Sequence, residues 1–594
     1  MHKFNTIIIG TGAAGYAAAD ALRRHGVTDI AIVTNGKNCG TSRNIGSDKQ
    51  TYYKPSQDGQ TEDSAAALAW DYMDGGCCDG VLAYVEGANS MRCFYRLLEL
   101  GVYFPQDKYG AFPSYKTDHD RGGRATSIGP LTSKSMVECL EKQVLERDKT
   151  PIFDDMQVVK ILRKKDRVYG IAALCKGKTL VSIFAKNVIF ATGAPANIYA
   201  QSVYPQSQRG ATGVLIDAGV KLVNFCEWQY GLASLKFRWN LSGTYLQVMP
   251  HIYSEDEQGK KYDFIYDALG ANGIAAVFRK GSQWPFDAAK IDGTSRLDML
   301  IHAETSAKRR VFLDYRRNPT GYDFKALPKD VRDYLQERES VFDTPIGRME
   351  RLNPKAIELY MSKGIDLYSE PLEAAICAQH NNGGVLVDEH CRTNLEGLYV
   401  IGEAAGIFGL TRPGGSALNS TQVTALRAAR AIAGDAASGD DDLPTTDEDF
   451  ADVIKELQTQ ISTVKIDPFT APSKIPTRMS DCAGFLRRHE DIVKLLEDVR
   501  KNMTDLAPIA QNLSEYFYER DMLRSSLAML VSIIATMEKT GSRGGALYIR
   551  NGAVQPENIL YRSKRAVTNI AAGVEFIDTR PIPKESTVFE KVYK

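Results

Sequence analysis

A glycine-rich turn between two β-prone runs, two later buried strands that end in small residues, and apolar stripes at helical spacing near the C-terminus together predict an α/β fold. We expect a Rossmann-like domain that is interrupted by an α+β capping domain and followed by a C-terminal helical domain. The chain has 594 residues, which is enough for several domains of ordinary size. Its content of 43% hydrophobic and 25% charged residues is typical of a globular protein.

The first element is a βαβ unit. Residues 4–9 form a β-prone run, residues 10–15 read Gly-Thr-Gly-Ala-Ala-Gly, residues 17–25 are good helix sequence, and a second strand follows at 30–33. In such a unit the first glycine allows a tight turn, the second lets the backbone approach a pyrophosphate, and the third lets helix and strand pack closely. The helix N-terminus then faces the phosphates. This order predicts a dinucleotide site, with a glycine-rich turn that binds nothing as the alternative.

The second strand lacks the acidic residue that usually binds the adenosine ribose. It ends Val33-Thr34-Asn35, where Asp or Glu is expected. Either the ribose is held in another way or the nucleotide is not the usual NAD.

Three later segments indicate which dinucleotide is bound. Residues 188–193 read as a buried strand that runs into a small-residue turn, and residues 398–403 read as another that ends in Gly402-Glu403. A carboxylate in that position can bind ribityl hydroxyls. Residues 414–418 open a helix whose N-terminus can face the pyrimidine end of a flavin, where negative charge gathers on reduction. Together, in this order, the segments predict FAD.

Across nearly its whole length the sequence resembles the succinate dehydrogenase/fumarate reductase flavoprotein family, which also includes L-aspartate oxidase and the adenylylsulfate reductase flavoprotein subunit. The stretches that carry the resemblance are 34–35 with 41–43 (the family's TK…RSHT), 227–230 (EFVQFHPT), 311–314 (VYLDL), 383–385 (HxxMGG), Arg412 (NRLGSNSL) and 542–544 (ESRGAH). The resemblance implies an FAD-binding domain, a cap and a helical domain, with hydride transfer between substrate and flavin N5 beneath the cap. It also implies that the missing acid is normal for this branch.

The glycine turn and the resemblance together predict the residues that bind the cofactor. These are Gly10, Gly12, Ala13, Ala14, Gly15, Thr34, Asn35, Thr41, Ser42, Ser47, Val158, Ala191, Thr192, Gly193, Glu403, Ser416, Ala417 and Leu418. We predict no metal site.

The sequence also departs from the family pattern. Ser42 stands where the family's dehydrogenases have a histidine bonded covalently to FAD, so we expect non-covalent FAD. Gly231 and Gln379 align with two active-site histidines, although His380 lies one place along. Leu269 falls near the cap arginine that delivers the proton in fumarate reduction. The resemblance therefore argues against succinate and fumarate as substrates.

We consider four residues as catalytic candidates. Arg412 would lie between the 398–403 strand and the flavin-facing helix, in a position suited to bidentate capture of a carboxylate; an ion pair with Glu403 or another nearby acid is the alternative. His380 is a candidate acid, base or hydrogen-bond donor; the alternative is that it has only a structural role. Tyr230 is a candidate proton donor; the alternative is that it is an aromatic residue packed in the core. Arg279 is a candidate replacement for the cap arginine; the alternative is that it is an exposed charge in a loop.

The predicted organisation divides the chain into four parts. Residues 1–235 and 365–440 form the FAD-binding domain, 236–364 the capping domain, 441–547 the helical domain and 548–594 a tail of short strands and loops. A Gly/Asp-rich stretch at 434–449 reads as a linker, and apolar residues repeat at helical spacing over 485–499 and 513–537.

Composition excludes several other classes. The chain has 73 Lys+Arg and 73 Asp+Glu, so it has no basic footprint for nucleic acid or anionic lipid. Its 10 cysteines are scattered, which argues against a disulfide framework, structural zinc or an iron–sulfur cluster and favours the cytoplasm. The longest late apolar run, 527–537, is well short of the ~20 residues of a membrane span.

The leading hypothesis is an FAD-dependent oxidoreductase that transfers a hydride to or from a C–C (ene/ane) bond of a small carboxylate- or carbonyl-bearing substrate other than fumarate or succinate. One alternative is oxidation of a C–N or C–O bond, as in aspartate oxidase. Another is a flavin-bearing electron-transfer subunit with an iron–sulfur partner. The chain has one convincing dinucleotide motif and no haem motif, so electrons enter or leave through the substrate, oxygen, a quinone, a diffusible carrier or a partner protein.

Overall fold

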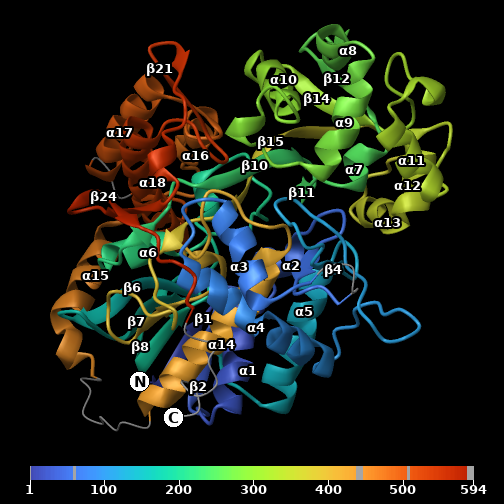
Figure 1. Ribbon diagram of the computed structural model, residues 1–594. Helices are drawn as coiled ribbons and strands as arrows, with labels where there is room; N and C mark the ends of the chain where they lie inside the picture. Colours follow the sequence, from blue (N-terminus) through green and yellow to red (C-terminus); the bar gives the residue numbers. More distant parts are fainter. Residues whose placement is uncertain (1, 58–61, 437–445, 505–508, 585–594) are drawn as a thin grey trace.

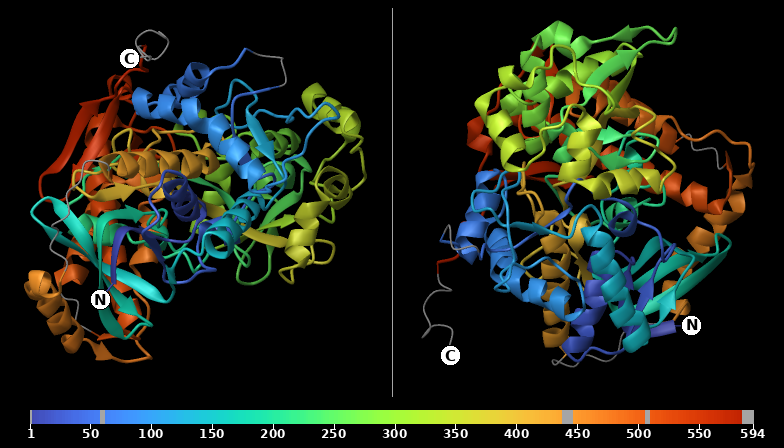
Figure 2. Two further views of the ribbon diagram at one scale, coloured as in Figure 1. Left: turned by 90° about the horizontal axis from the view of Figure 1, so that it is seen from below. Right: turned by 90° about the vertical axis from the view of Figure 1, so that its right-hand side faces the viewer.

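The central feature of the fold is a seven-stranded mixed sheet, seen in a computed structural model that describes residues 2–57, 62–436, 446–504 and 509–584 (Figure 1). The strand order is β5-β2-β1-β8-β7-β6, and β17 pairs with β8 outside this path. The cap lies above this sheet in the right-hand view of Figure 2, with its elements in green and yellow.

The parallel strands of the central sheet position the first site residues. They are β5 (Ile152–Phe153), β2 (Ile30–Val33), β1 (His2–Ile9), β8 (Thr179–Phe190) and β17 (Leu398–Val400). The apolar runs of β1, β2, β8 and β17 are buried, as expected for strands that are covered on both faces, and the edge strand β5 is partly buried. Because these strands are parallel, their carboxyl ends meet at one edge, where residues 10–15, 191–193 and 401–403 emerge.

Two long helices cover one face of this sheet. The alanine-rich α1 (Ala13–Arg24) begins inside the glycine turn and packs along α14 (Ser416–Ala436). Small side chains on α1 allow the close approach of the two helices, and both helices belong to one buried apolar cluster. Beyond β8, the strands β7 (Arg167–Cys175) and β6 (Met156–Lys164) continue the sheet as an antiparallel meander.

The cap is built on a second, six-stranded sheet in the order β11-β10-β15-β14-β12-β13. Strand β10 (Trp228–Ser234) leads out of the first domain, and β15 (Leu372–Asn381) leads back into it; the two strands pair antiparallel. Their register shifts between Gln229 and Tyr230, which leaves Gln379 as an extra residue in β15. This β-bulge changes which side chains of β15 face the first domain.

The C-terminal part is helical and then returns to the first domain. The helices α17 (His489–Thr504) and α18 (Leu513–Thr540) match the predicted apolar stripes and confirm the helical domain. After them, β23 (Lys564–Asn569) pairs with β9 (Leu222–Val223) in a four-stranded sheet. Much of the predicted linker 434–449 lies outside the described residues. Among the described helices, none has the length and apolar character that a bilayer crossing requires.

Candidate active site

An elongated cavity of about 980 Å³ runs along the carboxyl edge of the central sheet. It is lined by the glycine turn, by the start of α14, by loops of the cap and by α18. All but two of the predicted cofactor-binding residues line it; the exceptions are Gly15 and Ser416. Ser416 is fully buried and its hydroxyl donates to the carbonyl of Pro413, so it shapes the turn before α14 instead.

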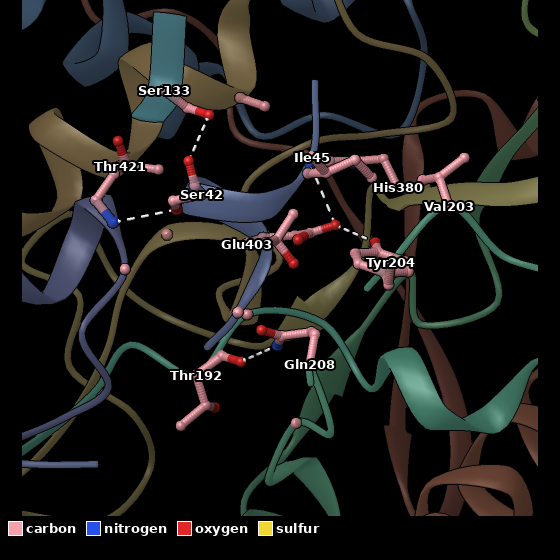
Figure 3. Close-up of a pocket in the computed structure, with 18 of the residues that line it drawn as sticks. Ser42, Ile45, Ser133, Thr192, Val203, Tyr204, Gln208, His380, Glu403 and Thr421 are labelled. Atoms are coloured by element: carbon pink, nitrogen blue, oxygen red, sulfur yellow. Dashed lines mark hydrogen bonds and ion pairs between the residues drawn. The ribbon is translucent and has the colours of Figure 1, made fainter. Parts of the chain in front are cut away.

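The glycine turn has the close contacts that the motif predicts. Gly10 has a φ of +111°, and a Cβ there would lie 2.6 Å from the carbonyl oxygen of Ala191. A Cβ at Gly15 would lie 2.1 Å from the carbonyl oxygen of Gly10, so this glycine serves helix–strand packing. Ser42 closes the turn: its hydroxyl accepts from the Ala13 N–H at 3.1 Å (Figure 3). No side chain caps α1 from Gly12, which suits an N-terminus that faces an anion.

At the far end of the cavity, the helical domain supplies contacts that the sequence did not indicate. The side-chain amide of Asn35 donates to the hydroxyl of Tyr518 on α18. The guanidinium of Arg209 lies 4.7 Å from the centre of the Tyr518 ring. Both residues line the cavity, as does Gln157 on β6. The helical domain therefore covers the end of β2 where the ribose-binding acid is missing.

The cavity contains buried polar atoms that lack a partner in the described structure. Three of them are the hydroxyls of Thr41 and Thr192 and the side-chain carbonyl of Gln157. A buried unsatisfied polar atom costs about 1–3 kcal/mol, so native proteins rarely leave several along one cavity. A long ligand with donors and acceptors along its length would satisfy them. These residues and the glycine cradle fit FAD.

Glu403 and its neighbours form the other end of the cofactor region (Figure 3). The Tyr204 hydroxyl and the backbone N–H of Asn381 both donate to one carboxylate oxygen, the latter at 3.2 Å. His380 Nε2 lies 3.6 Å from the same oxygen. Burial raises the pKa of Glu403, while the hydrogen bond from Tyr204 acts in the opposite direction. The backbone N–H of Ala194 also binds this carboxylate and lowers its pKa.

Arg412 lies beside His380 and has no carboxylate partner. Its Nε lies 3.3 Å from His380 Nδ1, which is also 3.1 Å from the side-chain oxygen of Asn382 and donates to it. One terminal nitrogen of Arg412 lies 3.5 Å from the Pro413 carbonyl and from the Ser416 hydroxyl. Among the described residues no acid is within ion-pair distance, so the ion pair with Glu403 is not formed. Burial and then the Arg412 charge hold the pKa of His380 well below its usual value, so this histidine is neutral.

The structure does not bring Tyr230 or Arg279 to the site. The Tyr230 hydroxyl lies 2.9 Å from that of Tyr199 and accepts from Arg487 at 3.1 Å, inside the contact with the helical domain. Arg279 pairs with Asp330 at 3.1 Å, and its side chain is half exposed. Neither residue lines the cavity. The packed aromatic is therefore the correct interpretation of Tyr230. Arg279 is an exposed charge, as the alternative had it, but it lies on helix α9 (Asn272–Ser282) and not in a loop.

A loop that carried no recognised motif also lines the cavity. It includes Asp118 and His119, and it is fixed to the turn before α14 because the Gly414 N–H donates to the Asp118 carbonyl at 2.9 Å. His119 has a φ of +57°, a left-handed conformation that a non-glycine residue rarely adopts and that often marks a functional site. Burial raises the pKa of Asp118 to about 7, against the opposing charges of Lys280, Lys290 and Arg412.

Trp284 of the cap occupies the space beside Gly231. A Cβ at Gly231 would lie 2.3 Å from the Trp284 ring, so the ring lies directly on the glycine backbone. Trp284 also lines the cavity. Where the family pattern has a histidine, this chain therefore presents a flat aromatic wall.

Comparison with known proteins gives three kinds of match. The model of a family described as FAD binding domain matches residues 5–418. The chain is 26% identical over 450 residues to a subunit of the fumarate reductase (CoM/CoB) of Methanothermobacter marburgensis, covering 74% of each chain. It is 23% identical over 426 residues to L-aspartate oxidase of Synechocystis sp., covering 69% of this chain and 67% of that one.

Solved structures match over nearly the full length. The Sdh1 complex of Mycobacterium smegmatis matches with a TM-score of 0.73 and 18% identity, covering 98% of this chain and 95% of that one. E. coli quinol fumarate reductase matches with a TM-score of 0.72 and 18% identity, covering 98% of both. At these identities the likeness shows the fold.

Proposed function

This chain belongs to the FAD binding domain family, and from that premise we propose that it catalyses hydride transfer to or from a C–C (ene/ane) bond of a small carboxylate- or carbonyl-bearing substrate other than fumarate or succinate. It is an FAD-dependent oxidoreductase related to fumarate reductase and aspartate oxidase. FAD supplies the hydride chemistry, and the protein binds and orients the substrate and transfers the proton.

The observation that carries this proposal is the Arg412 guanidinium. It lies in the cavity, its polar contacts are long (3.3–3.5 Å), and its guanidinium lies 5.6 Å from the centre of the Phe408 ring. Among the described residues it has no carboxylate within ion-pair distance. A buried cation of this kind is costly unless a ligand neutralises it. The guanidinium fork matches a carboxylate in a bidentate geometry. We therefore assign Arg412 to substrate binding, with the neutral His380 beside its Nε atom.

The surroundings of Gly231 support a substrate other than fumarate. Trp284 takes up the space of the missing side chain, and Gln379 replaces a second titratable residue with a neutral amide. Arg412 thus offers a guanidinium site for one carboxylate, while Lys290 also lines the cavity.

The proposal is tested by reducing the holoenzyme with light under anaerobic conditions and adding candidate acceptors. Reoxidation by α,β-unsaturated acids, with formation of the saturated acid, supports the proposal. Reduction of the oxidised enzyme by amino acids or hydroxy acids, with no response to unsaturated acids, refutes it. That second outcome would favour the aspartate-oxidase-like alternative, to which the L-aspartate oxidase relative already points.

Asp118 is our candidate for the group that transfers the proton. It lines the cavity on a loop that is bound to the turn after Arg412. The pKa of Asp118 is raised to about 7, so the carboxyl is protonated below that pH and can donate. In the reductive direction we expect kcat/KM to fall as the pH rises through about 7. Asp118→Asn should lower kcat and abolish this limb of the profile; an unchanged profile would exclude Asp118.

FAD is expected to be held without a covalent bond, because Ser42 occupies the position of the linking histidine. Acid precipitation of the holoenzyme should release essentially all the flavin into the supernatant, measured by its absorbance. Yellow colour that stays with the precipitate would contradict this expectation. Cys39, which also lines the cavity, would then be the first residue to examine for a linkage.

We also propose that the electrons come from a partner protein or a diffusible carrier, because the chain has a single dinucleotide motif. Native purification that recovers an iron–sulfur protein in stoichiometric amounts would support the partner. Full turnover of the isolated chain with a small reduced carrier would show that no partner is needed.

A further inference from the structure

The end of strand β2, where the ribose-binding acid is missing, contacts the helical domain. Val33 is the last residue of β2, and the side-chain amide of Asn35, two residues later, donates to the hydroxyl of Tyr518 on α18. Tyr518 lies outside residues 5–418, the part of the chain that the family model matches. The family model therefore does not account for this contact.

Asn35 and Tyr518 both keep accessible surface and both line the cavity. Asn35 is exposed and Tyr518 is partly exposed. A primary amide has two N–H donors and a carbonyl acceptor, so one hydrogen bond to Tyr518 leaves an N–H and the carbonyl of Asn35 for other partners. Burial raises the pKa of Tyr518 to about 12, so its hydroxyl is neutral. The pair therefore offers uncharged hydrogen-bonding groups of the kind that bind a ribose hydroxyl.

Hydrogen bonds on both sides of Tyr518 fix the start of α18 to the first domain. Before it, the Gln157 amide of β6 donates to the Ser514 carbonyl at 3.2 Å. After it, the backbone N–H of Val214 donates to the Asp521 carboxylate at 3.0 Å. The ring is thus held beside the end of β2 without any contribution from a ligand, which lowers the entropy cost of binding one.

Arg209 braces the ring itself. Its guanidinium lies over the Tyr518 ring, 4.7 Å from the ring centre, which is within the range of a cation–π interaction. The same guanidinium donates to both carboxylate oxygens of Glu515, one turn earlier on α18, at 2.8 and 3.1 Å. Tyr518 is therefore a rigid part of the cavity wall.

From these contacts we infer that the helical domain holds the adenosine end of FAD. The Asn35 amide binds a ribose hydroxyl in place of the missing acid, and the Tyr518 ring forms the wall that retains the nucleotide. Tyr518 is also a positioning residue, because its hydroxyl orients the Asn35 amide. The inference concerns the cofactor, so it does not depend on which substrate the enzyme reduces or oxidises.

The inference is tested by the affinity of the flavin-free full-length chain for FAD and for FMN, which lacks the adenosine. Bound and free flavin are separated by ultrafiltration and measured by absorbance. Tyr518→Leu removes the wall and the orienting hydroxyl, so FAD should bind about tenfold to 100-fold more weakly. FMN affinity should change by less than about threefold, which also shows that the variant is folded. FAD release from the holoenzyme should be faster by a factor similar to the loss of affinity.

Two smaller changes separate the roles of the ring and the amide. Tyr518→Phe keeps the ring but loses the orienting hydroxyl, so FAD affinity should fall only about threefold to tenfold. Asn35→Leu removes the ribose contact and should cost at least as much. Tyr103→Leu is the matched control for Tyr518→Leu, because Tyr103 is 89% exposed and does not line the cavity. It should leave both affinities unchanged.

The comparison of FAD with FMN decides between cofactor binding and a merely structural contact. A loss of FAD affinity in all three variants, with FMN affinity preserved, supports the inference. FAD and FMN affinities that fall by the same factor in Tyr518→Leu would overturn it, because the loss would then come from folding or from the flavin end of the site. Unchanged FAD affinity in both Asn35→Leu and Tyr518→Phe would also overturn it.

Discussion

Replacing Arg412 with methionine is expected to lower kcat/KM for the acid substrate by about 30-fold to 5,000-fold, because truncating one partner of a buried charge pair costs about 2–5 kcal/mol. The variant should still bind FAD, since the cofactor region is lined mainly by the glycine turn, Thr192 and Glu403. The measurement is the rate of reoxidation of the photoreduced enzyme as a function of acid concentration, together with the flavin content of the purified variant.

Two further variants make this result specific. Arg412→Lys keeps the charge but loses the guanidinium fork, so it should fall between wild type and Arg412→Met. Arg279→Met is the matched control, because it makes the same change at an exposed arginine that pairs with Asp330. If Arg412→Met stays within about threefold of Arg279→Met, Arg412 does not bind the substrate and the proposal loses its main support.

Replacing Arg543 with methionine is expected to have the second large effect, a lower free energy of unfolding. Arg543 and Glu227 are each 1% exposed, and two guanidinium nitrogens donate to one carboxylate oxygen at 2.8 and 3.0 Å. Removing one partner of a buried ion pair strands the other charge and costs about 3–5 kcal/mol. We expect a markedly lower denaturant midpoint for the holoenzyme, measured by circular dichroism and by flavin fluorescence.

The double variant Glu227→Gln/Arg543→Met should recover part of this loss, because it leaves no buried charge without a partner. Arg562→Met breaks a partly exposed pair with Glu557 and should cost no more than about 1 kcal/mol. A similar midpoint for Arg543→Met and Arg562→Met would show that the buried pair contributes little.

Local patterns were sufficient to predict the elements that form the cofactor cradle. The strand predicted at 30–33 is β2, the strand at 4–9 lies within β1, and the helix after the glycine turn is α1, which begins earlier than predicted. These elements depend on residues that are close in the chain. The spacing of the hydrophobic residues and the positions of the glycines are therefore enough to identify each strand and helix. The motifs around Glu227 and Arg543 were also recognised, but their ion pair was not, because it joins residues 316 positions apart.

The substrate region was harder to predict for two physical reasons. Tyr230 was a candidate proton donor, yet its neighbour Gln229 lines the cavity and Tyr230 does not. Successive side chains of a strand point to opposite faces, so a shift of one residue exchanges them. Trp284 and Tyr518 reach the cavity from other domains, and no local pattern reports such contacts. Asp118 lies in a loop, where neither a hydrophobic periodicity nor a sequence motif indicates a functional site.

The pairing of β9 with β23 affects how the protein can be made. Val223 pairs with Val567, and Asn224 exchanges two hydrogen bonds with Ala566, 342 positions later. During synthesis on the ribosome, β9 emerges long before its partner and keeps an open strand edge, which is prone to wrong pairing. Tyr518 also emerges late. The cavity therefore gains its full wall only after most of the chain has been translated.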